Sequence, residues 1–174
     1  YLRHVIHVVP QKSNLFSGTI KDNLLMGDRS ADDRDIDFAL KVSQSAEFVS
    51  KLKDGTNTLI EENSKNLSGG QKQRLCIARA IMGHPRILIF DDSSSALDFA
   101  TDAALRKALK ENLNDTTVFL VSQRVNTVKN ADKILVLDDG ELVATGTHKE
   151  LYKTNEVYRD ICLSQLSEKE VASV

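Results

Sequence analysis

A serine, two glycines and a glutamine, Ser68-Gly69-Gly70-Gln71, stand at the entrance of a predicted helix. The serine occupies the N-cap position, and apolar residues recur after it at helical spacing. Two glycines let a ligand approach the backbone closely, and the free N–H groups of a first helical turn direct positive charge at an anion. A capped helix with a flexible start would explain these four residues equally well. The pattern is therefore a candidate phosphate site whose interpretation depends on the rest of the chain.

Two adjacent carboxylates follow about twenty residues later. Asp91 and Asp92 end an apolar run, residues 86–91, which predicts a strand buried on both faces because its residues do not alternate. Asp98 comes soon afterwards and can cap another helix. A lone aspartate at the end of a strand is more often a helix cap than a metal ligand. The position of these carboxylates after the glycine-containing helix nevertheless favours a nucleotide site.

Together these patterns resemble the ATP-binding cassette family. Five motifs of that family are matched in its order: the glutamine loop at Gln11, the signature motif at residues 67–80, the Walker B strand at 87–92, the D-loop at 95–98 and the switch loop at 121–124. The resemblance extends from about residue 5 to about residue 158. Residues 14–24 and 146–161 are similar to the exporter branch of the family, whose cassettes are fused to membrane helices.

The resemblance implies a role for each matched residue. In this family two cassettes enclose two ATP molecules, and each site joins the Walker motifs of one chain to the signature motif of the other. The residues expected to act are Ser68, Gly69, Gly70 and Gln71 as the signature offered to a partner, Ser95 and Asp98 in the D-loop, Gln11 and Asp91 as Mg²⁺ ligands, and Asp92 and Gln123 at catalytic positions.

The phosphate loop G-x-x-x-x-G-K-[ST] is missing, since none of the eight glycines is followed by lysine. In the family this loop precedes the glutamine loop, so we expect the chain to begin just after it. The expected fold is the α/β core of a P-loop NTPase, with a parallel sheet and a helical signature subdomain but no N-terminal β subdomain. We expect the loss of those strands to leave a sheet edge and apolar surface exposed.

Two substitutions suggest a degenerate site. Hydrolytic members of the family carry a glutamate where this chain has Asp92, and a histidine where it has Gln123. The shorter aspartate withdraws its carboxylate by roughly 1.5 Å, and a misplacement of about 1 Å can cost ~100-fold in rate. Glutamine can donate a hydrogen bond but cannot carry positive charge. We therefore expect the weakly hydrolysing half of a heterodimeric exporter.

Elements that could position these residues follow from periodicity and turn signals. Strands are predicted at residues 5–9, 86–91 and 116–121, helices at 19–25, 32–42 and 68–82, a helix after Asp98, a short helix at 124–129, a hairpin of 133–137 with 141–144, and helices from about 148 and 156. Strands alternating with helices indicate a parallel sheet covered on both faces. We expect one partial nucleotide-binding domain, residues 1–165, and a disordered tail, residues 166–174.

Composition narrows the functional classes. The 174 residues have a formal net charge of −2, which gives no reason to expect a nucleic-acid partner. The two cysteines are expected to be buried and reduced, and no apolar run is long enough to cross a membrane. Arg74 and Arg79 are expected to pair with acidic groups, and His148 to be structural.

The resemblance implies ATP and Mg²⁺ as cofactors, ATP-driven export as the function of the assembled transporter, and inactivity of this chain alone. The expected partners are a second cassette and the transmembrane domains of the same transporter, at the cytoplasmic face of the cell membrane. Membrane contact would occur only through those domains. Two other interpretations remain open: a non-catalytic regulatory cassette, and a soluble ATPase of repair or translation.

Overall fold

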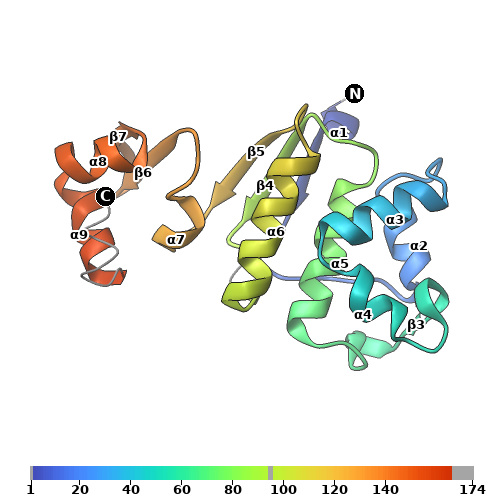
Figure 1. Ribbon diagram of the computed structural model, residues 1–174. Helices are drawn as coiled ribbons and strands as arrows, with labels where there is room; N and C mark the ends of the chain where they lie inside the picture. Colours follow the sequence, from blue (N-terminus) through green and yellow to red (C-terminus); the bar gives the residue numbers. More distant parts are fainter. Residues whose placement is uncertain (1, 94–95, 166–174) are drawn as a thin grey trace. The chain divides into compact units, whose positions relative to one another are not determined.

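The computed structural model describes residues 2–93 and 96–165, which form two compact units, Tyr1–Val121 and Ser122–Val174 (Figure 1). The first unit contains a three-stranded parallel sheet in the order β1 (Ile6–Val9), β4 (Ile87–Asp91) and β5 (Thr117–Val121). The predicted strands are therefore confirmed, except that residues 2–5 form a helical turn, α1 (Leu2–Val5). Whether residues 1–165 behave as one domain, with a disordered tail, stays a prediction.

Two long helices pack with one face of this sheet. They are α5 (Gly69–Ile81) and α6 (Phe99–Asn112), whose apolar side chains join a single core with the inward residues of the strands. Val9, Leu88 and Phe90 are buried there. Sequence periodicity predicted that α5 and α6 would pack on the sheet. This packing holds in place the N-termini of the two helices, which are capped by Ser68 and Asp98.

A smaller group of elements lies beside α5 (Figure 1). It contains α2 (Ile20–Leu25), α3 (Asp33–Val42), α4 (Ala46–Ser50), a two-stranded ribbon of β2 (Gly18–Thr19) and β3 (Leu59–Ile60), and short 3₁₀ turns at Gly55–Asn57 and Glu62–Ser64. Thr19 and Asp32 cap α2 and α3, and in each case the side chain accepts a backbone N–H while the third helical residue reaches back. The predicted starts of both helices are confirmed.

The other face of the sheet corrects one prediction. Residues 86–91 were expected to be buried on both sides, but in β4 only Leu88 and Phe90 are buried, while Ile87 and Ile89 are half-buried. Val8, Phe119 and Val121, on the same face, are 53%, 48% and 55% exposed. Among the described residues of the first unit, no helix covers this face. The expectation of exposed apolar surface is thereby confirmed.

This apolar face should make the isolated 174-residue chain self-associate. We expect Phe119→Lys combined with Val121→Lys to weaken that association by roughly tenfold or more, because burying each side chain is worth about 1.5–3 kcal/mol. Sedimentation velocity over a concentration series measures the effect. Leu59→Lys, at a residue 68% exposed on β3, is the matched control. A wild-type chain that stays monomeric at high concentration would contradict the prediction.

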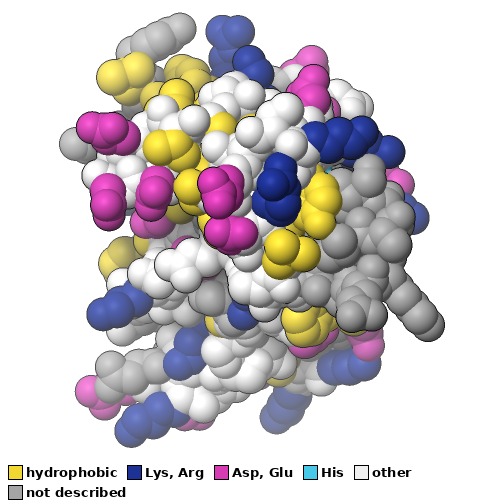
Figure 2. All heavy atoms as spheres, turned by 90° about the vertical axis from the view of Figure 1, so that its left-hand side faces the viewer, with side chains coloured by type: hydrophobic (Ala, Val, Ile, Leu, Met, Phe, Trp, Pro, Cys, Tyr) yellow, Lys and Arg dark blue, Asp and Glu magenta, His cyan; other side chains and the backbone are white. Residues whose placement is uncertain are grey.

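Within residues 122–165, the second unit contains a hairpin and three helices. The elements are β6 (Ile134–Asp138), β7 (Glu141–Gly146), α7 (Val125–Val128), α8 (His148–Thr154) and α9 (Glu156–Gln165). Asp139 and Gly140 both have positive φ, 46° and 81°, as the tight hairpin turn predicted from Asp-Asp-Gly requires. Figure 2, seen from the side of this unit, shows hydrophobic side chains interleaved with charged ones.

The surroundings of the two cysteines and of His148 bear on two predictions. Cys162 is fully buried beside Tyr158, and Cys76 is buried in the first unit, so both cysteines are free and buried as expected. His148 Nδ1 lies 2.8 Å from the Tyr158 hydroxyl, and partial burial lowers the pKa of its imidazole. These contacts support the structural interpretation of His148.

Candidate functional site

The N-terminus of α5 is closed by a reciprocal pair of hydrogen bonds. Ser68 Oγ accepts the Gln71 backbone N–H at 3.2 Å, and Gln71 Oε1 accepts the Ser68 N–H at 2.8 Å. This arrangement satisfies two donors and fixes the first turn. The N–H groups of Gly69 and Gly70 stay at the positive end of the helix, where they can face an anion.

The surroundings of the two glycines differ. A Cβ placed on Gly69 would meet nothing within 4 Å, and Gly69 does not have positive φ. No described neighbour in this chain therefore requires glycine at that position. A Cβ on Gly70 would lie 3.4 Å from the Ala96 carbonyl oxygen. A ligand from outside the chain would approach the backbone closely through the open space at Gly69.

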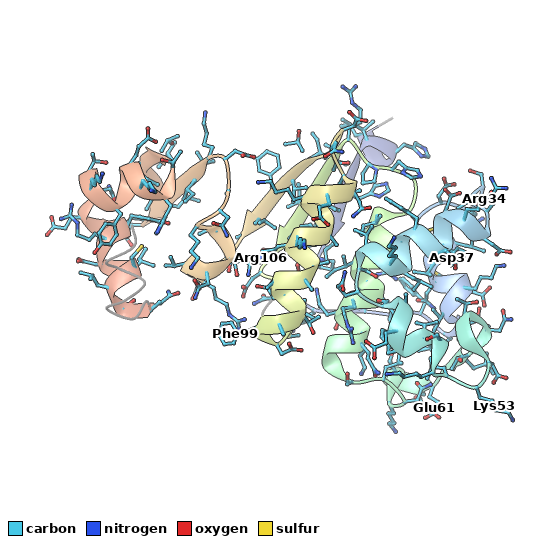
Figure 3. The ribbon with its side chains drawn as sticks, in the orientation of Figure 1. Arg34, Asp37, Lys53, Glu61, Phe99 and Arg106 are labelled. Carbon is cyan, nitrogen blue, oxygen red and sulfur yellow. The ribbon has the colours of Figure 1, made fainter. Side chains whose placement is uncertain are left out.

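Asp98 lies beside this helix entrance and caps α6. Its carboxylate accepts the Thr101 backbone N–H at 2.9 Å and the Thr101 hydroxyl at 2.8 Å, which lowers the pKa of Asp98. The next residue, Phe99, is 75% exposed at the start of α6 (Figure 3). The predicted cap is confirmed, whereas a contact across a dimer stays a prediction. Ser95, the other predicted D-loop residue, lies outside the described residues.

Gln11 and Asp92 are brought together by the sheet. In the parallel pair β1 and β4, Val9 is opposite Phe90, so the residues two places further on leave the sheet at the same edge. Gln11 Nε2 donates to Asp92 Oδ2 at 3.3 Å. This contact leaves the amide oxygen of Gln11 available as a ligand.

The neighbouring carboxylate, Asp91, is exposed at the end of β4. Asp92 has a φ of 42°, an unusual value for a residue other than glycine, and its N–H donates to the Val121 carbonyl at 2.9 Å. Backbone strain of this kind is common at functional sites. The two carboxylates therefore lie at the carboxyl edge of the sheet, next to Gln11.

These oxygen atoms are of the kind that Mg²⁺ prefers. Magnesium is usually held by one or two carboxylates together with waters and substrate phosphates, not by an all-protein cage. In the described parts of the chain, no group of three or more His, Cys, Asp or Glu side chains could hold a metal. The donor set of Gln11, Asp91 and Asp92 therefore fits a magnesium ion that arrives with a nucleotide.

Gln123 belongs to the second unit. Its backbone carbonyl accepts the Gln165 side-chain amide at 2.8 Å, and the Gln165 oxygen accepts the Val125 N–H at 3.0 Å. Gln165 thereby ties the end of α9 to the segment that carries Gln123. Sequence reasoning missed this contact because no local pattern links residues forty positions apart.

Among the described residues, the hydrogen bonds of the two arginines of α5 go to backbone carbonyls and not to the acidic groups that were predicted. Arg74 donates to the carbonyl oxygens of Gln44 and Gly70, at 2.6 Å and 3.4 Å, and Arg79 donates to the Asn14 carbonyl at 3.0 Å. The Gln44 carbonyl lies in the turn after α3, outside the helical hydrogen-bond ladder, so a guanidinium that reaches it satisfies both groups. The acidic Glu61 and Glu62, in the segment before α5, are exposed (Glu61 is labelled in Figure 3).

Comparisons with known proteins show the family of this chain. Residues 1–95 match the family model described as "ABC transporter". An export ATP-binding/permease protein of Rickettsia felis is 43% identical over 166 residues, which are 95% of this chain and 29% of the relative. YheI of Bacillus subtilis, named as a multidrug resistance ABC transporter ATP-binding/permease protein, is 43% identical over 159 residues, or 91% and 27%.

A solved structure is similar as well. A bacterial Atm1-family ABC exporter with ATP bound superimposes with a TM-score of 0.90 at 35% identity, covering 95% of this chain and 29% of that one. The chain thus spans about three tenths of the length of the relatives it matches. The predicted α/β fold with a parallel sheet is confirmed by this likeness.

Proposed function

Because the chain belongs to the ABC transporter family, as one of its ATP-binding domains, we propose that it serves ATP-driven export by completing an ATP site on a partner cassette. The observation that carries the proposal is the start of α5. Its cap is intact, and the space at Gly69 is open to a ligand that no described residue supplies. Ser68 to Gln71 would contact the phosphates of an ATP molecule held by the partner, and Asp98 would reach toward the same chain.

A second, weaker site would lie at the edge that carries Gln11, Asp91 and Asp92. Gln11 and Asp91 would hold Mg²⁺, and Asp92 would orient the attacking water. ATP supplies the transferable phosphoryl group, and Mg²⁺ neutralises the developing charge. The residues present fit the metal, but no phosphate loop occurs among these 174 residues. In the assembled transporter this site would bind ATP and hydrolyse it slowly, because Asp92 and Gln123 replace glutamate and histidine.

The partners we propose are a second, non-identical cassette and the transmembrane domains of the same transporter. The relatives named above carry ATP-binding and permease functions in one name, which supports that arrangement. In the described parts of this chain, no helix is long and apolar enough to cross a membrane. On the likeness to these export relatives, we place the domain at the cytoplasmic face, with membrane contact only through the transmembrane domains and with no nucleic-acid partner.

Calorimetric titration of Mg-ATP into the 174-residue chain tests this proposal. We expect no saturable binding, because the β- and γ-phosphates of ATP have no cradle in these residues. Addition of the partner cassette should create saturable binding, and Ser68→Arg should abolish the part that depends on this chain. Binding of one ATP per chain without any partner would contradict the proposal.

A non-catalytic regulatory cassette is the second candidate. Asp92 and Gln123 favour it, since both positions depart from the hydrolytic pattern in the same chain. ATP binding without turnover in every cassette pairing would support this alternative. An ATPase of repair or translation is less consistent with relatives named as export and multidrug resistance proteins.

A further inference from the structure

Arg74, one turn after Gly70 on α5, is bound on several sides. Its Nη1 donates to the Gln44 carbonyl at 2.6 Å, and its Nε donates to the Gly70 carbonyl at 3.4 Å. The guanidinium carbon also lies 4.9 Å from the centre of the Phe48 ring. One planar group thus joins the first turn of α5 to the segment between α3 and α4.

The turn that Arg74 reaches is tightly constructed. Ser45 N–H donates to the Leu40 carbonyl at 2.7 Å, and Gln44 N–H donates to the Lys41 carbonyl at 3.2 Å. These two bonds form the helix-ending motif that usually places glycine in the left-handed position, yet here that position is Gln44, with φ 60°. The hydroxyl of the fully buried Ser43 donates to Ser45 Oγ at 2.9 Å. The Gln44 carbonyl is therefore presented at a fixed place.

On its other side, Arg74 is close to the D-loop. Gly70, one turn earlier on the same face of α5, lies against Ala96, as the 3.4 Å separation of its Cβ position from the Ala96 carbonyl indicates. Partial burial lowers the pKa of the Arg74 guanidinium, while the nearby carboxylates of Asp98 and Glu47 act in the opposite direction. The side chain thus lies between the α3–α4 turn, the signature turn and the charged cap of α6.

We propose that Arg74 is a positioning residue, which holds the first turn of α5 at the distance and angle that hydrolysis of the partner's ATP requires. This inference rests on the proposed function, because it assigns Arg74 to the site that Ser68 to Gln71 complete. The planar fork and the stacking face suit arginine, whereas lysine offers one point charge and cannot make both hydrogen bonds while covering Phe48. Loss of the fork would let the signature turn shift relative to the D-loop.

The test uses the assembled full-length transporter with Arg74→Lys and Arg74→Met. We expect kcat for ATP to fall on the order of 10-fold in Arg74→Lys and further in Arg74→Met, since small displacements at a reacting site cost about that much. KM for ATP should stay within about twofold, because the partner's own motifs bind the nucleotide first. The thermal midpoint of Arg74→Lys should stay close to that of the wild type.

Lys41→Met is the matched control, because it removes one positive charge near the same turn without touching the Arg74 contacts. A kcat for Arg74→Met within twofold of the wild type would overturn the inference, and so would an equal loss in Lys41→Met. If Arg74→Met does not fold, Phe48→Leu carries the test, since it removes the ring under the guanidinium while keeping an apolar side chain against the core. We expect roughly a threefold loss of kcat in Phe48→Leu, and an unchanged kcat would overturn the inference.

Ser68→Arg, measured in parallel, separates this inference from the proposed function. If Ser68→Arg keeps full activity, the chain does not complete a partner's site and the proposed function is wrong. If Ser68→Arg is inactive while the Arg74 variants are normal, only the positioning role is wrong.

Discussion

Ser68→Arg should reduce the ATPase rate of the assembled transporter by roughly 100-fold or more, the effect expected when the donors that face a reacting phosphate are lost. The substitution has two physical consequences. It removes the side-chain oxygen that accepts the Gln71 N–H, and it places a long side chain next to the space that Gly69 leaves open. A phosphate could then no longer approach the first turn of α5. Steady-state ATP turnover in membrane vesicles measures the effect.

Three other substitutions separate steric blocking from loss of stability. Ser68→Thr keeps the capping hydroxyl and should stay active, whereas Ser68→Ala should lose about 1 kcal/mol of helix stability and only part of the activity. Thr147 caps α8 with the same kind of reciprocal pair, so Thr147→Arg is the matched control in the other unit. If Thr147→Arg were as inactive as Ser68→Arg, the loss would reflect folding and not the site.

Asp92→Asn tests whether the two sites are unequal. If this chain's own site contributes little, Asp92→Asn should leave most of the turnover intact while Ser68→Arg removes it. Equal losses in the two variants would contradict the asymmetric picture, because they would mean that both sites hydrolyse ATP.

Helix starts could be predicted from sequence because their causes are local. Ser68, Asp98, Thr19 and Asp32 each accept a backbone N–H two or three residues further on. Such bonds depend on residues within one turn, which a single sequence displays. The hairpin at Asp139-Gly140 is local in the same way, since two adjacent residues with positive φ determine it.

Features that depend on distant residues could not be predicted. The five-residue helix α4 is too short to show a period and is held by packing. The apolar run in β4 correctly predicted a strand, but burial of both its faces depends on whether other residues cover the second face. Arg74 was expected to find an acidic partner, but the Gln44 carbonyl accessible to it is created by the ending of α3, thirty residues away in sequence.

Contacts at the candidate site were also beyond what the sequence could predict. The resemblance implied that Gln11 and Asp91 hold Mg²⁺ and that Asp92 acts in catalysis. It did not predict the hydrogen bond from Gln11 to Asp92, which the register of β1 with β4 explains. The link from Gln165 to the segment of Gln123 had no signal in the sequence, because it depends on how α9 folds back within its unit. The predicted roles of Gln11, Asp91, Asp92 and Gln123 in catalysis stay predictions, which the following experiment addresses.

Asp92→Glu combined with Gln123→His should raise hydrolysis at this chain's own site by on the order of 10- to 100-fold. Glutamate extends the carboxylate by one C–C bond toward the attacking water, and histidine can place positive charge near the γ-phosphate. The measurement is best made in the Ser68→Arg background. Because that change silences the site on the partner, the remaining turnover reports only the site that holds Gln11 and Asp92.

Each single substitution serves as a control for the pair. Asp92→Glu alone should recover part of the rate, and Gln123→His alone less, since a charged contact cannot replace a misplaced base. The Gln11 amide now donates to Asp92 at 3.3 Å, and a glutamate at that position would have to leave this contact or bend around it. If the double variant in the Ser68→Arg background gains no turnover, the two substitutions do not explain the weakness of this site. The regulatory interpretation, in which the site binds ATP without hydrolysing it, would then be favoured.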